Sequence, residues 1–240
     1  MTTPPAADQI LDGLQCVARE REARRADTAL EAAVAAVKRY QHARFGQTYA
    51  DLMAEQRYAR AAEFSLSDLY GPADFTDRDA QFARIVPALV RLFPSHIVAT
   101  VAELSSLHAV SERLDSAMAR LRLAGAGGGG GAALGGTEYG KLWRAVGDAS
   151  SREQQIALMV SVGRALDGYT RSMLLRQSLR LMRGPATAAG LAALQGFLER
   201  GFDTFRDMRG ADHFLATIAS RERSLAAHLF AGGSGPEVPA

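Results

Sequence analysis

Residues 95–123 read SHIVATVAELSSLHAVSERLDSAMARLRL, and this stretch decides the fold class. Apolar side chains recur at every third or fourth position, the spacing that places them along one face of an α-helix. Pro94 and Ser95 mark its start, because proline is tolerated at the beginning of a helix and serine is a good N-terminal cap. The predicted buried face comprises Ile97, Val101, Leu104, Leu107, Leu114, Met118 and Leu121. We therefore expect one long helix that packs against others.

The same spacing continues on both sides of this helix, and no segment alternates apolar and polar residues as a strand does. Further helices are predicted over about residues 6–25, 28–41, 57–70, 76–93, 139–146, 150–183, 186–208 and 212–229, with a short helix capped by Thr48 after the second. Residues 6–41 could instead form one long helix, and residues 150–183 a pair of helices. Each apolar stripe must be buried against another element. The sequence thus predicts an all-α protein, a multi-helix bundle or orthogonal helical array with no substantial sheet.

Capping residues and helix breakers predict where these helices begin and end. Thr28 and Ser150 each precede a glutamate by three residues, which is the pattern of a capping box. Gly46 is expected to interrupt the second helix, and the dipeptide Gly184-Pro185 to end another. Pro87 lies inside a predicted helix and is expected to kink or break it near residues 84–86, because proline removes a backbone hydrogen bond.

A glycine-rich tract, GAGGGGGAALGG at residues 125–136, divides the chain near its middle. Its composition predicts a flexible loop in which nothing packs. Two half-domains are one interpretation; we favour a single helical domain over residues 28–230 that contains this loop. Residues 1–27 are expected to form an N-terminal helix with a possible extension, and residues 231–240 a disordered tail.

Composition limits the classes of function. The 240 residues include 28 Lys and Arg against 26 Asp and Glu, a net charge of +2 that predicts no general attraction to nucleic acid. No apolar run approaches the roughly 20 residues that cross a bilayer, and no secretory signal is recognised. Cys16 is the only cysteine and is predicted to be a buried, inert thiol. These features predict a cytoplasmic protein, and no cofactor is indicated.

The best polar constellation is formed by His108, Glu112 and Asp115, whose spacing of four and three places them on one helix face. One histidine and two carboxylates are possible metal ligands, but a di-iron bundle needs Glu-x-x-His pairs from other helices, and the sequence has none. The favoured interpretation is that both carboxylates are solvated and pair with Arg113 or Arg120.

Arg176, Arg180 and Arg183 form a second candidate, a row that could bind an anion or an acidic partner. The alternative is that these arginines complement the dipole of a helix C-terminus and are otherwise solvated.

Several stretches resemble a bacterial family known by the motif FFLEELY: FSLSDLYGP (64–72), RDAQFAR (78–84), PALVRLFP (87–94), LHAVSERLD (107–115), LMRGP (181–185) and FLERGFDTF (197–205). The resemblance covers roughly residues 30–230, and it implies a functionally uncharacterised protein with no catalytic residue to carry over. Ser65 and Ser67 replace the second Phe and the first Glu of the motif, and Asp68 the second Glu. Chemistry that needs a pair of carboxylates at this position is therefore disfavoured.

Two functions follow as hypotheses. The first is association with a protein partner, with a homodimer as the expected form. The sequence carries a full set of signals for helices and turns, but no set of reactive residues that is expected to come together in a site. The alternative is a helical binder of a small molecule or metal, of the haem-oxygenase-like oxidase type, in which His108, Glu112, Asp68 and Glu63 would take part. Whether the chain is an enzyme stays open, with no catalytic residue assigned.

Overall fold

The computed structural model describes residues 5–69, 76–125 and 131–238. All regular structure in these ranges is helical and no strand occurs in them, which confirms the predicted all-α fold class. The elements are α1 (Pro5–Arg25), α2 (Thr28–Thr48), α3 (Ala50–Ala54), α4 (Ala59–Phe64), the π-helical turn η1 (Ser65–Leu69), α5 (Thr76–Leu92), α6 (Ser95–Ala124), α7 (Gly136–Val146), α8 (Ala149–Thr170), α9 (Met173–Leu181), α10 (Arg183–Ala188), α11 (Ala192–Met208) and α12 (Asp212–Phe230).

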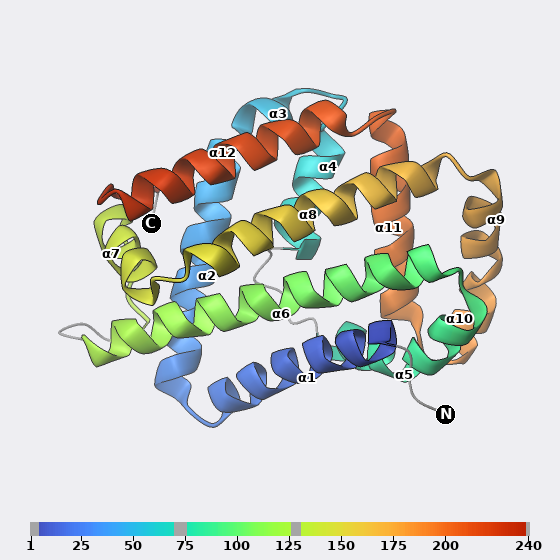
Figure 1. Cartoon of the computed structure of the whole chain (residues 1–240), viewed down its shortest axis with the longest axis horizontal. Coiled ribbons are helices and arrows are strands. Elements are labelled where there is room, and N and C mark those ends of the chain that lie inside the picture. Colours follow the sequence, from blue (N-terminus) through green and yellow to red (C-terminus); the bar gives the residue numbers. More distant parts are fainter. Residues whose placement is uncertain (1–4, 70–75, 126–130, 239–240) are drawn as a thin grey trace.

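The long helices form two crossing sets (Figure 1). The helices α1, α6, α8 and α12 lie side by side, and α2 and α11 cross them behind. Among the described residues, no helix is long and apolar enough to traverse a bilayer. The arrangement is therefore an orthogonal helical array with α6 near its centre.

Two helix starts differ from the predicted capping boxes. Asp27, not Thr28, caps α2, and its Oδ1 accepts hydrogen bonds from the backbone amides of Ala29 and Leu30 at 3.0 and 3.1 Å. Asp148 caps α8 in the same way and accepts from the amide of Ser151 at 2.9 Å. A short carboxylate at the cap position satisfies these amides and complements the positive end of the helix dipole.

The predicted interruptions are also displaced. Helix α2 continues through Gly46, and α5 continues through Pro87 to Leu92. Gly184-Pro185 does not end a helix but lies in the first turn of α10, where proline leaves no backbone bond unmade. The break falls earlier, after α8, where Ser172 Oγ accepts from the amide of Leu175 at 3.3 Å and starts α9.

Burial on α6 is broader than one stripe. Leu107, Leu114 and Met118 are buried as predicted, whereas Leu121 is exposed and the first three members of the predicted face are only half-buried. The reason is that α1, α2 and α8 all pack on α6 and cover it from several directions. Polar side chains are consequently enclosed along with apolar ones.

The core draws residues from both sides of the glycine tract. One cluster contains Val37, Tyr40, Met118, Leu134, Tyr139, Leu142, Trp143 and Leu229, and another joins Phe45, Tyr49 and Leu52 to Phe205, Phe214 and Ile218. A third cluster packs α1 against α5 and α6 through Ala7, Ile10, Leu14, Val86, Leu89, Val98 and Ala102. The N-terminal helix is thus packed into the core.

The end of the glycine tract and the C-terminal segment pack where a flexible loop and a disordered tail were expected. Leu134 is buried in the core. Tyr40 donates a hydrogen bond to the carbonyl of Pro236 at 2.7 Å, and the amide of Gly235 donates to the carbonyl of Gly136 at 2.9 Å. A Cβ atom on Gly136 would lie 2.2 Å from the carbonyl oxygen of Gly235, so glycine permits this backbone contact. Residues 126–130 and 239–240 lie outside the described part.

Candidate functional site

A buried ionic cluster surrounds Glu112 of α6. Arg24 Nη2 from α1 lies 2.5 Å from Oε2, and Lys38 Nζ from α2 lies 2.7 Å from Oε1. Burial alone would raise the pKa of Glu112, but the charges of Lys38 and Arg24 outweigh burial and lower the pKa to about 2. Glu112 therefore ties three helices together as a carboxylate. The expectation of a solvated residue paired with Arg113 or Arg120 is wrong.

The other two members of the predicted constellation have partners of their own. Asp115 is buried, not solvated, and Gln41 donates a hydrogen bond to its Oδ1 at 3.0 Å. Burial raises the pKa of Asp115. His108 Nε2 lies 2.9 Å from Asp79 Oδ2 and 3.3 Å from Arg21 Nη2.

These contacts decide what the constellation can do chemically. Both oxygens of Glu112 are already paired with cations, so a metal ion would first have to displace Arg24 or Lys38. Within the described ranges, no group of three or more His, Cys, Asp and Glu side chains is placed to hold a metal ion. The backbone of Asp68 belongs to η1, and its side chain lies outside the described part of the structure. The arrangement is that of a structural ion network.

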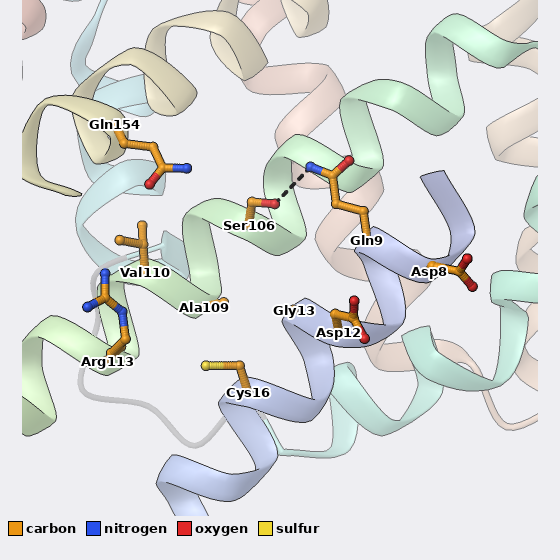
Figure 2. A pocket seen from close by; sticks show the side chains of 10 residues that line it. All are labelled: Asp8, Gln9, Asp12, Gly13, Cys16, Ser106, Ala109, Val110, Arg113 and Gln154. Carbon is orange, nitrogen blue, oxygen red and sulfur yellow. Dashed lines mark hydrogen bonds between the residues drawn. The ribbon is translucent and has the colours of Figure 1, made fainter. Parts of the chain in front are cut away.

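An open groove of about 590 Å³ lies between α1 and α6 (Figure 2). Asp8, Asp12 and Cys16 line it from α1, and Arg113 lines it from α6. Cys16 is half-buried and borders the groove, whereas the sequence predicted a buried thiol. Arg113 is engaged by Asp148 at 3.3 Å and by Ser151 Oγ at 2.7 Å. Among the described residues that line the groove, no group of acidic, histidine and cysteine side chains is placed to hold a metal ion.

Several of the exposed large hydrophobic residues of the described structure lie on α9 or directly after it. Met173, Leu174, Leu181 and Met182 expose 74%, 72%, 77% and 51% of their surface. Helix α9 buries none of its residues, and it is attached to α11 by a hydrogen bond from Gln195 Nε2 to the carbonyl of Leu179 at 2.6 Å. Exposed leucines scattered singly are normal in proteins, but four large apolar residues within ten positions form a patch.

The predicted arginine row borders this patch but is divided between two helices. Arg176 and Arg180 belong to α9, whereas Arg183 begins α10 and is paired with Glu199 of α11 at 2.6 Å. Arg180 is exposed and Arg176 is half-buried. The three side chains therefore do not form one closed anion site, although Arg176 and Arg180 give the edge of the patch a positive charge.

The stretches that carry the family resemblance pack against one another. The rings of Phe64 and Phe197 stack with centroids 5.7 Å apart, and the Arg78 guanidinium lies 4.6 Å from the centroid of Phe197. Asp79, the next residue, forms a hydrogen bond with His108 of α6. Residues far apart in the chain thus form one contact network.

Comparison with known proteins identifies the family of the chain. The family model described as Domain of unknown function (DUF8198) matches residues 20–236. The chain belongs to this family. No curated protein and no solved structure matches the chain. The DUF8198 domain therefore includes every helix from α2 to α12 and the end of α1.

Sequence reasoning missed the partners of Glu112 and Asp115 in this DUF8198 domain, although the sequence carries a signal for them. Gln41 falls on the apolar stripe of α2, and Arg24 lies seven residues after buried Val17, on the same face of α1. A polar residue on an apolar stripe requires a buried partner. Arg152 of α8, which is also buried, carries the same signal, because it lies four residues before buried Ile156 on the same face of the helix.

Proposed function

We propose that this protein acts by association with a protein partner through the outer surface of α9, and that it is not an enzyme. The observation that supports the proposal is the exposure of Met173, Leu174 and Leu181 on a helix that contributes no buried residue, and of Met182 directly after that helix. Burying one leucine side chain contributes about 1.5–3 kcal/mol. A partner that covers these four side chains would therefore gain a substantial driving force.

Charge selects the kind of partner. Residues 173–183 include three arginines and no acidic residue. Two copies of α9 placed face to face would bring like charges together, which disfavours the homodimer expected from the sequence. We propose instead an amphipathic segment of another protein, with apolar side chains that cover Leu174 and Leu181 and acidic side chains that face Arg176 and Arg180.

A site-specific photo-crosslinker tests this proposal in cells of the source species. We expect a crosslinker at Leu174 to join a specific protein through an acidic, apolar segment, and a crosslinker at exposed Gln15 of α1 not to do so. The purified pair should then bind more weakly as salt is raised. Leu174→Ser with Leu181→Ser should weaken binding tenfold or more, because two large apolar contacts are lost.

Sedimentation velocity of the purified chain separates the alternatives. We expect a monomer. A dimer that Leu174→Ser with Leu181→Ser dissociates would assign the patch to a second copy and contradict the acidic partner. Equal crosslinking at Leu174 and Gln15, or binding unchanged by the double substitution, would end the proposal of a docking surface.

The finer assignments of family and compartment are proposals of the same kind. We infer that the chain is a bacterial member of the FFLEELY-motif family, which FSLSDLYGP at residues 64–72 supports, and that residues 28–230 act as one domain. We also propose a cytoplasmic location, which the single cysteine supports. Fractionation of the source cells with an antibody to the chain tests the location, and recovery in a secreted fraction would contradict it.

A further inference from the structure

A small, partly open cavity of about 40 Å³ lies between α2, α7, α8 and α12. Gln41 and Arg44 line it from α2, Tyr139 and Trp143 from α7, Arg152 from α8 and Glu222 from α12. It lies in the helical core, and none of its lining residues belongs to the α9 surface. Its chemistry is therefore independent of the proposed docking surface.

Arg152 is buried without a carboxylate partner. It exposes 4% of its surface, and its guanidinium carbon lies 3.7 Å from the centroid of the Trp143 ring. Its Nη2 meets the sulfur of Met118 at 3.3 Å, and its Nη1 donates to Gln155 at 3.4 Å. No acidic side chain in the described ranges lies within ion-pair distance of it. An arginine stays charged in proteins, and a buried charge is costly unless it is paired.

Other hydrogen-bond donors in the cavity wall also lack an acceptor. Tyr139 Oη, Trp143 Nε1 and Arg44 Nε are buried and have no hydrogen-bond partner among the described residues. Glu222, the carboxylate of the wall, accepts from Arg44 Nη1 and from Tyr49 Oη, both at its Oε1 atom. The wall thus presents more donors than acceptors, and its two guanidinium groups face one carboxylate.

We propose that this cavity binds a compact monoanion, a halide ion or a small carboxylate of formate size, between Arg152, Tyr139 and Trp143. One negative charge matches the excess of one positive charge among the lining side chains, because Asp115 and Asp148 act on Arg152 from outside the wall and form no ion pair with it. A single water needs about 10–15 Å³, so the cavity has room for roughly three waters or for one such anion, but not for a nucleotide or a sugar phosphate. Acceptor atoms on the anion would satisfy the unpaired donors.

Trp143 supplies the readout, because it is the only tryptophan of the chain and its ring forms part of the cavity wall. The full-length protein is titrated with sodium bromide and with sodium formate at constant ionic strength. Sodium gluconate, a carboxylate too large for the cavity, is the balancing salt. We expect a saturable change of Trp143 fluorescence with the small anions and a rise in the midpoint of thermal unfolding.

Three variants test whether the change in Trp143 fluorescence comes from an anion bound in this cavity. Arg152→Met should weaken the apparent affinity about tenfold or more, because a hydrogen bond to a charged group is lost, and Tyr139→Phe should weaken it less. Arg164→Met is the matched control, since Arg164 is an exposed residue of the same helix, and it should bind like the natural chain.

Saturation by formate but not bromide would assign a carboxylate ligand, and saturation by both would assign a general monoanion site. A linear response equal to that of gluconate would show that the cavity holds only water and would overturn the proposal. Saturation that persists in both Arg152→Met and Tyr139→Phe would overturn it as well. If Arg152→Met does not fold, Tyr139→Phe alone decides between these outcomes.

Discussion

Replacing Glu112 with glutamine should destabilise the protein by about 3 kcal/mol at pH 7. The substitution keeps the shape of the side chain but removes the charge between Arg24 and Lys38. A pKa lowered from 4.5 to about 2 corresponds to about 3 kcal/mol of stabilisation of the charged form. Breaking a buried ion pair by removing one partner costs about 3–5 kcal/mol in other proteins, so the two arguments agree.

The loss should depend on pH in a defined direction. The pKa of Glu112 is lower in the folded chain than in the unfolded chain, so its contribution is fully present above about pH 4.5 and is lost as the pH falls through about 2. The difference between the natural chain and Glu112→Gln should therefore shrink to about 1.4 kcal/mol at pH 3 and be nearly gone at pH 2.

Equilibrium urea unfolding at pH 7, 4 and 3 measures this difference. Glu153→Gln is the matched control, because Glu153 pairs with Arg223 at the surface, where both side chains are about half exposed. That substitution should cost less than about 1 kcal/mol. Equal effects of the two substitutions at pH 7, or a Glu112→Gln effect that does not change between pH 7 and pH 3, would refute the argument that the buried triad stabilises the fold.

Four further substitutions have defined expected outcomes. Asp115→Asn should leave the free energy of unfolding at pH 7 unchanged or raise it in urea unfolding. Burial raises the pKa of Asp115 in the folded chain, so the contribution of Asp115 to stability falls as the pH rises above 3.8. A loss above about 1 kcal/mol would contradict this. Gly140→Ala should destabilise the protein by about 1–3 kcal/mol in thermal denaturation, because the new Cβ would lie 2.6 Å from the carbonyl oxygen of Gly233. Gly46→Ala should instead stabilise it by about 0.5–1 kcal/mol, because no atom outside its own helix lies within 4 Å of the Cβ position. If the two glycine substitutions shift the midpoint of thermal unfolding in the same direction, this prediction is contradicted. Arg152→Met in anion-depleted buffer should change stability by less than about 1 kcal/mol, because a thioether replaces an unpaired buried charge; a loss near that of Glu112→Gln would contradict it.

Periodicity was sufficient to predict the helices, because the spacing of apolar residues reflects the geometry of the helix itself. Helix α6 begins at Ser95 as predicted and extends one residue beyond Leu123. Boundaries that depend on one capping contact were displaced by one or two residues. Asp27 and Thr28 are both good capping residues, and only the backbone conformation decides which side chain reaches the free amides.

The polar interior could not be predicted in the same way, because its partners come from distant parts of the chain. Arg24 is 88 residues from Glu112, and Lys38 is 74 residues from it. A helical pattern shows which residues share a face but not which face of another helix lies opposite. Arg113 and Arg120 were nearer in sequence, yet they pair with Asp148 and with Glu20 at the surface.

The two buried polar regions differ in how their charges are matched, and this difference separates structure from binding. Each oxygen of Glu112 has a cationic donor within 2.7 Å, so a ligand there would have to replace an ion pair that already exists. Arg152 instead meets a sulfur atom, an amide oxygen at 3.4 Å and the face of Trp143, all weaker acceptors than a carboxylate. An anion that binds at Arg152 would not have to break an existing ion pair. A bound molecule would therefore add most to the stability of the fold at the unmatched charge of Arg152. It would add less at the larger cluster of candidate ligands that was predicted from the sequence.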